Sequence, residues 1–402
     1  MTYWLTNALL ETGYEMDGET VIGTKTASFH LLIENEQIAK IVPANEALTD
    51  NLPQKDAKNL LVLPSFVEKH CHLDKTLLGD DWRAVTPTKD IFGRFEVEKT
   101  VLPTLRTSTQ ERAEILLARY LQYGVTHVRT HVDIYPEVGL KNLDQVQMAL
   151  QTFEGKLSNE IVAFPQHGLL RTNAKELVRE ALRQGAGLVG GVDPAMVDGD
   201  IERSLQEMVE LAVEGNAGID LHLHDADQLG IYTIKRLAQL AVEAGLQGKV
   251  AVSHAFALGD ISPAQAEEIA ELLGNAGMAI ITSVPIGRNF PPVGLLHKKG
   301  VEVAVGCDNI FDSWSPFGNG DVLERAGRLA QLSRWSHERA LAETLQFITN
   351  GIKPLDDKGQ QVWPKVGDAA NMVLVEASCS AEAIARTSKR VTTIYKGNIV
   401  AE

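Results

Sequence analysis

Two histidines separated by one residue, His70 and His72, end an apolar run that begins at Leu63. In an extended strand, residues two apart point to the same side, so both imidazoles would face one point in space. Imidazole nitrogens are common ligands of divalent metal ions. The pair therefore predicts part of a metal site, although paired histidines also occur in ordinary protein cores.

Further candidate ligands end other apolar runs of the chain. His222 follows the run that starts at Ala217, His254 ends the run from Val250, and Asp308 follows Val303-Ala-Val-Gly-Cys. A lone histidine is more often a hydrogen-bonded core residue than a ligand. The shared position of several histidines at the ends of predicted strands, however, favours a common site. Several imidazoles with one carboxylate suit a borderline ion. We predict one divalent metal ion, with zinc as the first choice and ferrous iron as the alternative.

Strand-like and helix-like patterns alternate through most of the chain. We expect strands over 61–72, 125–132, 161–168, 187–194, 219–225, 249–256, 279–285 and 301–308. Amphipathic helical patterns lie between them, near 106–122, 140–154, 174–185, 200–215, 229–245, 263–276 and 321–334. Continuous apolar strands alternating with helices predict right-handed βαβ units and a parallel sheet. Eight such units predict an α/β fold, a closed (β/α)8 TIM barrel whose active site lies at the carboxyl ends of the strands.

The two ends of the chain follow a different pattern. Alternating segments at 28–33, 37–42, 371–375 and 391–400 predict short antiparallel strands. We therefore expect a small β-sandwich that both termini build together. The predicted division is 1–60 for the first part of the sandwich, 61–350 for the barrel and 351–402 for the second part.

Composition excludes several function classes. A net charge of −15 without a Lys/Arg stripe argues against a nucleic-acid partner. No apolar run approaches the roughly 18 residues of a membrane span, so no membrane partner is expected. The polar start predicts no signal peptide, and three cysteines cannot form a disulfide framework, so we expect a cytoplasmic protein. The sequence leaves open whether the chain forms a homo-oligomer.

Several longer segments carry a family likeness. VRTHVD at 128–133, IDLHLHD at 219–225, GCDN at 306–309 and PFGNGD at 316–321 resemble the amidohydrolase superfamily, specifically its cytosine deaminase-like branch and the triazine-degrading enzymes within it. The resemblance implies that His70, His72, His222 and Asp308 hold the metal, and that His254 is catalytic. Two-metal members carry a lysine on strand four, but the run 187–194 has none, which favours a mononuclear site.

The resemblance also implies the reaction. We expect a metal-dependent hydrolase that cleaves a C–N bond, by hydrolytic deamination of a small heterocycle such as a pyrimidine or triazine. Asp308 would accept a proton from the attacking water, His254 would stabilise charge on the intermediate, and Asp225 would help to protonate the departing nitrogen. Cytosine deaminase has a glutamate at the position of Asp225, and the shorter carboxylate makes cytosine itself a doubtful substrate.

Other residues are weaker candidates for contacts with the substrate. Gln166 matches a base-contacting position of cytosine deaminase, and its amide can both donate and accept hydrogen bonds. The remaining predicted contacts are Lys75, His224, Asn309 and Trp314. The long connection over 73–104 is predicted to act as a lid. Two alternatives stay open: a mononuclear amide or cyclic-amide hydrolase, and an inactive relative kept as a binding or structural protein.

Overall fold

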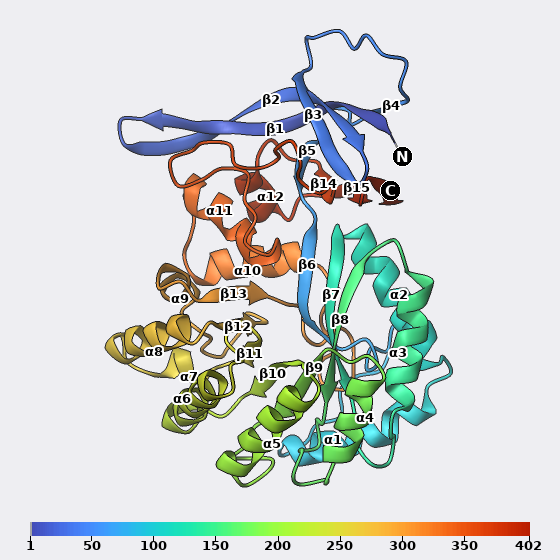
Figure 1. Ribbon diagram of the computed structural model, residues 1–402, viewed down its shortest axis with the longest axis vertical. Coiled ribbons are helices and arrows are strands. Elements are labelled where there is room, and N and C mark those ends of the chain that lie inside the picture. The colour runs from blue at the N-terminus through green and yellow to red at the C-terminus, as the bar shows by residue number, and fades with distance from the viewer. Residues whose placement is uncertain (1) are drawn as a thin grey trace.

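The computed structural model of the protein describes residues 2–402. Two sheets of eight strands each organise the fold. In Figure 1 the upper sheet carries both ends of the chain, and the lower one forms a barrel surrounded by helices. Among residues 2–402, no helix combines the length and the apolar character needed to cross a membrane.

The barrel sheet is parallel throughout, and its strands follow one another in chain order. They are β6 (Phe66–Cys71), β7 (Val125–Asp133), β8 (Ser158–Phe164), β9 (Leu188–Val192), β10 (Gly218–Leu223), β11 (Val250–His254), β12 (Met278–Thr282) and β13 (Glu302–Val305). The amide of Asp308 donates to the carbonyl of His70 at 2.7 Å, and Cys71 forms a parallel bridge with Asp308. These contacts join the first strand to the segment after the last, so the predicted eight-stranded barrel fold is confirmed.

Helices connect and cover the strands. They are α1 (Ile91–Val101), α2 (Thr109–Gln122), α3 (Lys141–Thr152), α4 (Lys175–Arg183), α5 (Ile201–Glu214), α6 (Asp227–Glu243), α7 (Ala257–Asp260), α8 (Pro263–Asn275), α9 (Val293–Lys298), α10 (Val322–Leu332), α11 (Glu338–Thr344) and α12 (Ser380–Arg386), with 3-10 turns η1 (Leu102–Thr104) and η2 (Leu345–Ile348). Local sequence explains where several begin: Ser108 with Glu111 and Ser262 with Gln265 form capping boxes that satisfy the first free amides of α2 and α8.

Close packing inside the barrel depends on small residues in β9. All five residues of this strand are buried. A β-carbon at Gly190 would lie 2.8 Å from the carbonyl oxygen of Ala163 and 2.9 Å from the Cα of Phe164, which are backbone atoms of β8. Because backbone cannot move aside easily, only glycine lets these two strands approach each other in this way.

The second sheet combines both termini, as predicted. Its order is β16-β15-β14-β5-β1-β2-β3, and β4 pairs with β1. The strands are β1 (Tyr3–Asp17), β2 (Thr20–Glu34), β3 (Gln37–Pro43), β4 (Gln54–Asp56), β5 (Leu61–Pro64), β14 (Met372–Val375), β15 (Arg390–Tyr395) and β16 (Asn398–Ala401). The strands β1 and β2 have 15 residues each and are longer than the short strands expected from alternation, because bulges let their pairing continue past irregular positions.

Two further details differ from the sequence expectation. The strand predicted over 61–72 divides at Ser65: β5 pairs with β14 in the terminal sheet, and β6 pairs with β7 in the barrel. The predicted lid segment contains helix α1, which begins where the side chain of Asp90 accepts from the amide of Gly93 at 2.8 Å. Periodicity missed this helix because its polar and apolar residues do not separate cleanly into two faces. The domain limits stay predictions.

Candidate active site

The predicted metal ligands and the predicted catalytic residue His254 come together at the carboxyl ends of the barrel strands. His70 lies in β6 and His72 directly after it, while His222 lies in β10 and His254 ends β11. Asp308 follows β13 by three residues and is brought beside His70 by the contact that closes the barrel. Residues separated by up to 238 positions in the chain thus share one end of the barrel.

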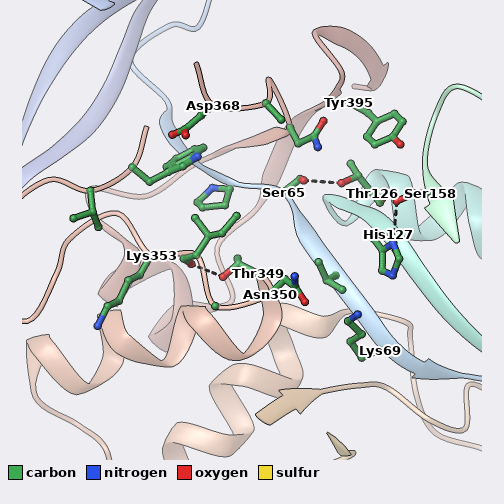
Figure 2. Close-up of a pocket in the computed structure, with 18 residues that line it drawn as sticks. Ser65, Lys69, Thr126, His127, Ser158, Thr349, Asn350, Lys353, Asp368 and Tyr395 are labelled. Atoms are coloured by element: carbon green, nitrogen blue, oxygen red, sulfur yellow. Dashed lines mark hydrogen bonds between the residues drawn. The ribbon is translucent and has the colours of Figure 1, made fainter. Parts of the chain in front are cut away.

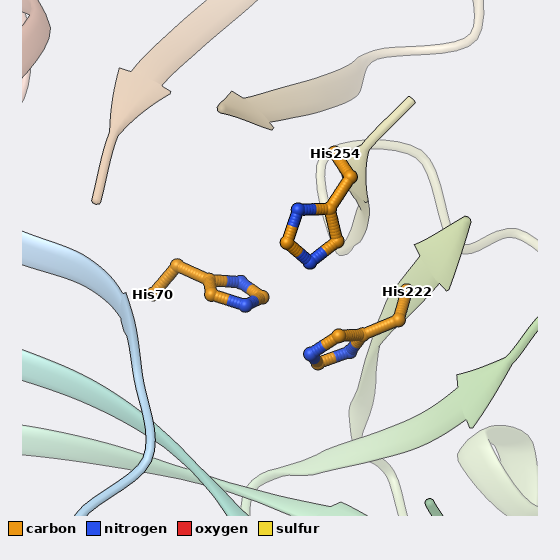
Figure 3. A group of neighbouring side chains, drawn as sticks. All are labelled: His70, His222 and His254. Carbon is orange, nitrogen blue, oxygen red and sulfur yellow. The ribbon is translucent and has the colours of Figure 1, made fainter. Parts of the chain in front are cut away.

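Distances between the side chains define the cluster. The Nε2 atoms of His70 and His72 lie 3.6 Å and 3.5 Å from the same carboxylate oxygen of Asp308. One ring nitrogen from each of His70, His222 and His254 falls within 4.8 Å of the other two. Figure 3 shows these three rings pointing toward a common centre from different strands.

The chemistry of these atoms fits a metal ion. Among the described residues, both ring nitrogens of His222 and of His254, and Nε2 of His70, are buried without a hydrogen-bond partner. Buried polar atoms are costly unless something satisfies them. One ring nitrogen from each of these three histidines and the carboxylate of Asp308 form a donor set that suits a divalent cation.

Charge states in the cluster agree with this donor set. Burial and the neighbouring His131 lower the pKa of His222 well below its usual range, and burial together with His224 does the same for the pKa of His254. Burial opposes ionisation of Asp308, but the neighbouring imidazoles of His254 and His70 hold its pKa well below the ordinary value. Neutral imidazoles and an ionised carboxylate are the forms that bind metals.

Two residues of the cluster have an unusual backbone conformation. His254 and Asp308 adopt the left-handed region, with φ of 68° and 60°. For residues other than glycine this conformation costs about 1–3 kcal/mol, so the surrounding structure must hold it in place. In both cases the unusual backbone lies at a residue of the cluster.

Two more predicted residues, His224 and Asp225, lie at the rim of the cluster. The ring of His224 stacks on that of His254, with centroids 4.4 Å apart, and its Nδ1 is 2.8 Å from Oδ2 of Asp193. Burial opposes the charged ring, but the Asp193 carboxylate raises the pKa of His224 above its usual value. Burial and the nearby Asp193 raise the pKa of Asp225 to about 6, and neither of its carboxylate oxygens has a side-chain partner.

A second polar group lies beside the cluster and centres on Lys75. Its ammonium donates to the amide oxygen of Gln166 and forms ion pairs with Asp133 at 3.0 Å and Glu98 at 3.9 Å. The amide nitrogen of Gln166 in turn donates to Glu98 at 2.8 Å. Burial opposes the charge on Lys75, but these carboxylates raise its pKa above the ordinary value, so the ammonium stays charged. The structure thus joins two predicted substrate contacts, Lys75 and Gln166.

The remaining two predicted contacts behave differently from each other. The indole nitrogen of Trp314 donates to Glu98, so Trp314 belongs to the group around Lys75. The amide of Asn309 instead donates to Asp312 at 2.8 Å, and Asp312 also accepts from the backbone of the following turn. Asn309 therefore holds its own loop, and the structure does not join its side chain to Lys75.

Sequence reasoning missed three carboxylates of the site. Asp133 ends β7 two residues after His131, a spacing that already placed it on the same side of the strand. Asp193 follows β9 directly, in the position where the other strands carry their polar residues. Glu98 gave no such signal, because it comes from α1 in the predicted lid and reaches the site only through the tertiary fold.

A cavity of about 640 Å³ opens at the other end of the barrel, next to the terminal sheet. Figure 2 shows its lining, which includes Ser65 just before β6, Lys69 within β6, and His127 and Ser158 near the beginning of β7 and β8. The site residues lie at the carboxyl ends of the strands, whereas Ser65, His127 and Ser158 lie at or near the strand starts. The two regions therefore occupy opposite faces of the barrel.

Comparison with known proteins identifies the family of the chain. The family model described as "Amidohydrolase family" matches residues 95–401. The chain belongs to the amidohydrolase family. This amidohydrolase is 30% identical over 386 residues to the N-isopropylammelide isopropyl amidohydrolase of Pseudomonas sp. (strain ADP), and the match covers 94% of this chain and 95% of that protein. Its relatives are hydrolases that act on C–N bonds, as this enzyme does.

Solved structures support the same assignment. The structure of N-isopropylammelide isopropylaminohydrolase from Burkholderia multivorans matches the present structure with a TM-score of 0.87 and 30% sequence identity. The match covers 100% of this chain and 98% of the Burkholderia chain. The 5-methylcytosine deaminase from Klebsiella pneumoniae, liganded with 5-fluorocytosine, has a TM-score of 0.81 and 25% identity, with coverage of 99% and 97%. The predicted resemblance to the cytosine deaminase-like branch is thereby confirmed.

Proposed function

We propose that this amidohydrolase uses one divalent metal ion to release ammonia or an amine from an amino-substituted nitrogen heterocycle. The observation that carries the proposal is the set of buried ring nitrogens of His70, His222 and His254 that have no protein partner and lie around the Asp308 end of the barrel. A bound cation or ligand would satisfy these buried nitrogens, which are otherwise costly to the fold.

In this proposal His70, His72, His222 and Asp308 hold the ion, which is zinc or ferrous iron. A divalent ion at this position supplies an activated water at neutral pH. The mononuclear form is favoured because β9 carries no lysine that could bridge a second ion, and Gly190 lacks the space for any side chain. Neither ring nitrogen of His254 has a hydrogen-bond partner, so the ring would be free to bond to a reacting group in the cluster.

The chain's own groups would then move the protons. Asp308 is ionised and accepts the proton of the attacking water, while the His254 ring stabilises the charge that develops on the ring of the substrate. Asp225, whose pKa of about 6 lies near neutrality, passes a proton to the departing nitrogen. His224, held by Asp193, would position the substrate next to His254.

The substrate class follows from the polar group around Lys75. A heterocycle with amino and keto substituents presents donors and acceptors in one plane, and the charged ammonium of Lys75 with the amide of Gln166 would bind an electron-rich oxygen or ring nitrogen. The relatives named for isopropylammelide and 5-methylcytosine act on planar rings of this kind. We therefore expect the substrate to be a pyrimidine or triazine.

We also propose a cytoplasmic location for the enzyme, because its three cysteines are free.

A substrate screen tests the proposal. Protein freed of metal by a chelator would be reloaded with zinc or ferrous iron and offered aminopyrimidines, aminotriazines, pterins and simple amides, with released ammonia or amine as the readout. We expect turnover of a heterocycle only after reloading, and none by an Asp308→Asn variant. The exposed Glu154→Gln variant serves as the matched control and should retain activity.

Three results would redirect the assignment. Turnover of plain amides alone would favour an amide hydrolase. Tight metal binding without turnover of any compound would favour a binding protein. Full turnover by protein that contains no metal would contradict the proposal as a whole.

A further inference from the structure

A line of hydrogen bonds runs through the barrel interior to His70. The Nδ1 of His70 lies 2.8 Å from the hydroxyl of Ser253, and that hydroxyl donates to Oδ1 of Asp220 at 2.6 Å. Arg129 donates to the other oxygen of Asp220, Oδ2, at 2.9 Å. Ser253 and Asp220 are fully buried, so water does not compete for these bonds.

The direction of each bond follows from the groups involved. A carboxylate accepts hydrogen bonds only, so the single hydroxyl proton of Ser253 points to Asp220. The oxygen of Ser253 can then only accept a hydrogen bond from His70. Nδ1 of His70 must therefore carry a proton and donate it to Ser253. His70 therefore keeps its lone pair on Nε2, the nitrogen that lies 3.6 Å from Asp308 and has no partner of its own.

The geometry points to a positioning role: we propose that Ser253 and Asp220 fix the tautomer of His70 in which Nε2 is free to bind the metal. The proposal rests on the metal site of the proposed function and names two residues outside its ligand set. Hydrogen bonds to the ring nitrogen that does not face the metal set the orientation and basicity of a ligating histidine.

The same network explains why Asp220 itself is not a ligand. Oxygen and nitrogen atoms of Asp220, His70 and His131 fall within 4.8 Å of one another, a spacing that could hold an ion. Both oxygens of Asp220 are already occupied, one by Ser253 and one by Arg129. Arg129 is held in turn by Glu160 at 3.0 Å near the start of the strands, so the carboxylate is oriented without help from a metal.

Removal of the hydroxyl is the first test. Apo protein would be titrated with zinc against a competing chelator, without substrate. We expect Ser253→Ala to bind zinc about 10- to 100-fold more weakly than wild type, because His70 is then free to adopt either tautomer. Ser65→Ala is the matched control, because Ser65 is also buried and bonded to a hydroxyl, that of Thr126, but belongs to the strand starts; it should bind zinc as wild type does.

Asp220→Asn is the sharper test. In this variant position 220 carries a side-chain amide. Arg129 only donates hydrogen bonds, so it holds the amide oxygen, and the NH2 group of the amide faces Ser253. Ser253 must accept that bond and donate its own proton to Nδ1 of His70, which moves the histidine proton to Nε2. We expect Asp220→Asn to bind zinc more weakly than Ser253→Ala does. In the double variant the transmitting hydroxyl is gone, so the affinity should return to that of Ser253→Ala.

The outcomes separate this proposal from the proposed function. The proposal would be overturned if Asp220→Asn lowered zinc affinity by the same factor in the wild-type and Ser253→Ala backgrounds. Wild-type zinc affinity of the Ser253→Ala variant would also overturn it. Should a variant fail to fold, nitrogen-15 NMR of histidine-labelled wild-type apo protein decides, because Nε2–H at His70 would overturn the assignment and Nδ1–H would support it. No substrate enters these measurements, so failure to find deamination leaves their result intact.

Discussion

The ammonium nitrogen of Lys75 lies 3.0 Å from Oδ1 of Asp133, and each side chain is 1% exposed. Glu98, equally buried, approaches the same ammonium from α1. Two acidic side chains thus lie against one cation in a region shielded from bulk solvent. Burial raises the pKa of Asp133 well above its usual range despite Lys75, whereas the pKa of Glu98 is held below its usual range by Lys75 against the effect of burial.

Replacement of Lys75 by methionine should destabilise the fold as well as impair substrate binding. Removing one partner of a buried ion pair leaves a charge without compensation, which costs about 3–5 kcal/mol. Urea unfolding of the variant measures this loss. Lys99→Met, which breaks the half-exposed pair with Glu137, is the control and should cost about 1 kcal/mol or less. Equal losses in both variants would show that Lys75 is not a buried charge centre.

His254→Ala should separate catalysis from metal binding. We expect turnover to fall at least about 100-fold, because a group that stabilises developing charge typically contributes that much, while zinc content stays near wild type. Metal analysis and single-turnover kinetics on the same preparation give both values. Because the ring of His254 also lies within ligand distance of His70 and His222, loss of the zinc would instead assign His254 to the ligand set.

Gly306→Ala should damage the metal site from outside the ligand set. A β-carbon there would lie 2.6 Å from the Cβ of His70 and 2.7 Å from its backbone nitrogen. These atoms belong to β6, so His70 must shift, and overpacking of this kind costs about 1–3 kcal/mol. Zinc affinity and urea unfolding should both fall. Gly187→Ala, where a β-carbon meets nothing within 4 Å, should change neither; a Gly306→Ala protein with wild-type zinc affinity would contradict the packing argument.

Glu160→Gln should reduce stability in a pH-dependent way. Burial opposes the charge, but His127, Arg129 and Lys69 hold the pKa of Glu160 far below its usual range. A carboxyl with a depressed folded pKa stabilises the protein above its unfolded pKa of about 4.3, and this contribution is lost as the pH falls below that value. The difference in urea midpoint between wild type and variant should therefore be larger at pH 7 than at pH 3. A constant difference would rule out this linkage.

Local patterns in the sequence were enough for the fold class and for the positions of the ligand candidates. Alternation placed His70 and His72 on one side, and their Nε2 atoms do approach the same oxygen of Asp308. Apolar runs separated by amphipathic segments predicted eight barrel strands, because burial on both faces leaves a signal in every strand. The family likeness added the expected roles, which stay predictions until the variants above are measured.

The partners of those residues were decided by the tertiary structure alone. Glu98 reaches Lys75 from a helix in a segment that periodicity described only as a lid. Ser253 reaches both Asp220 and His70 because strand register and barrel closure bring β10, β11 and β6 together. Sequence determines which side of a strand a residue faces, because that depends on neighbours along the chain. Which residue it meets there depends on how distant strands are aligned, so only the folded barrel decides it.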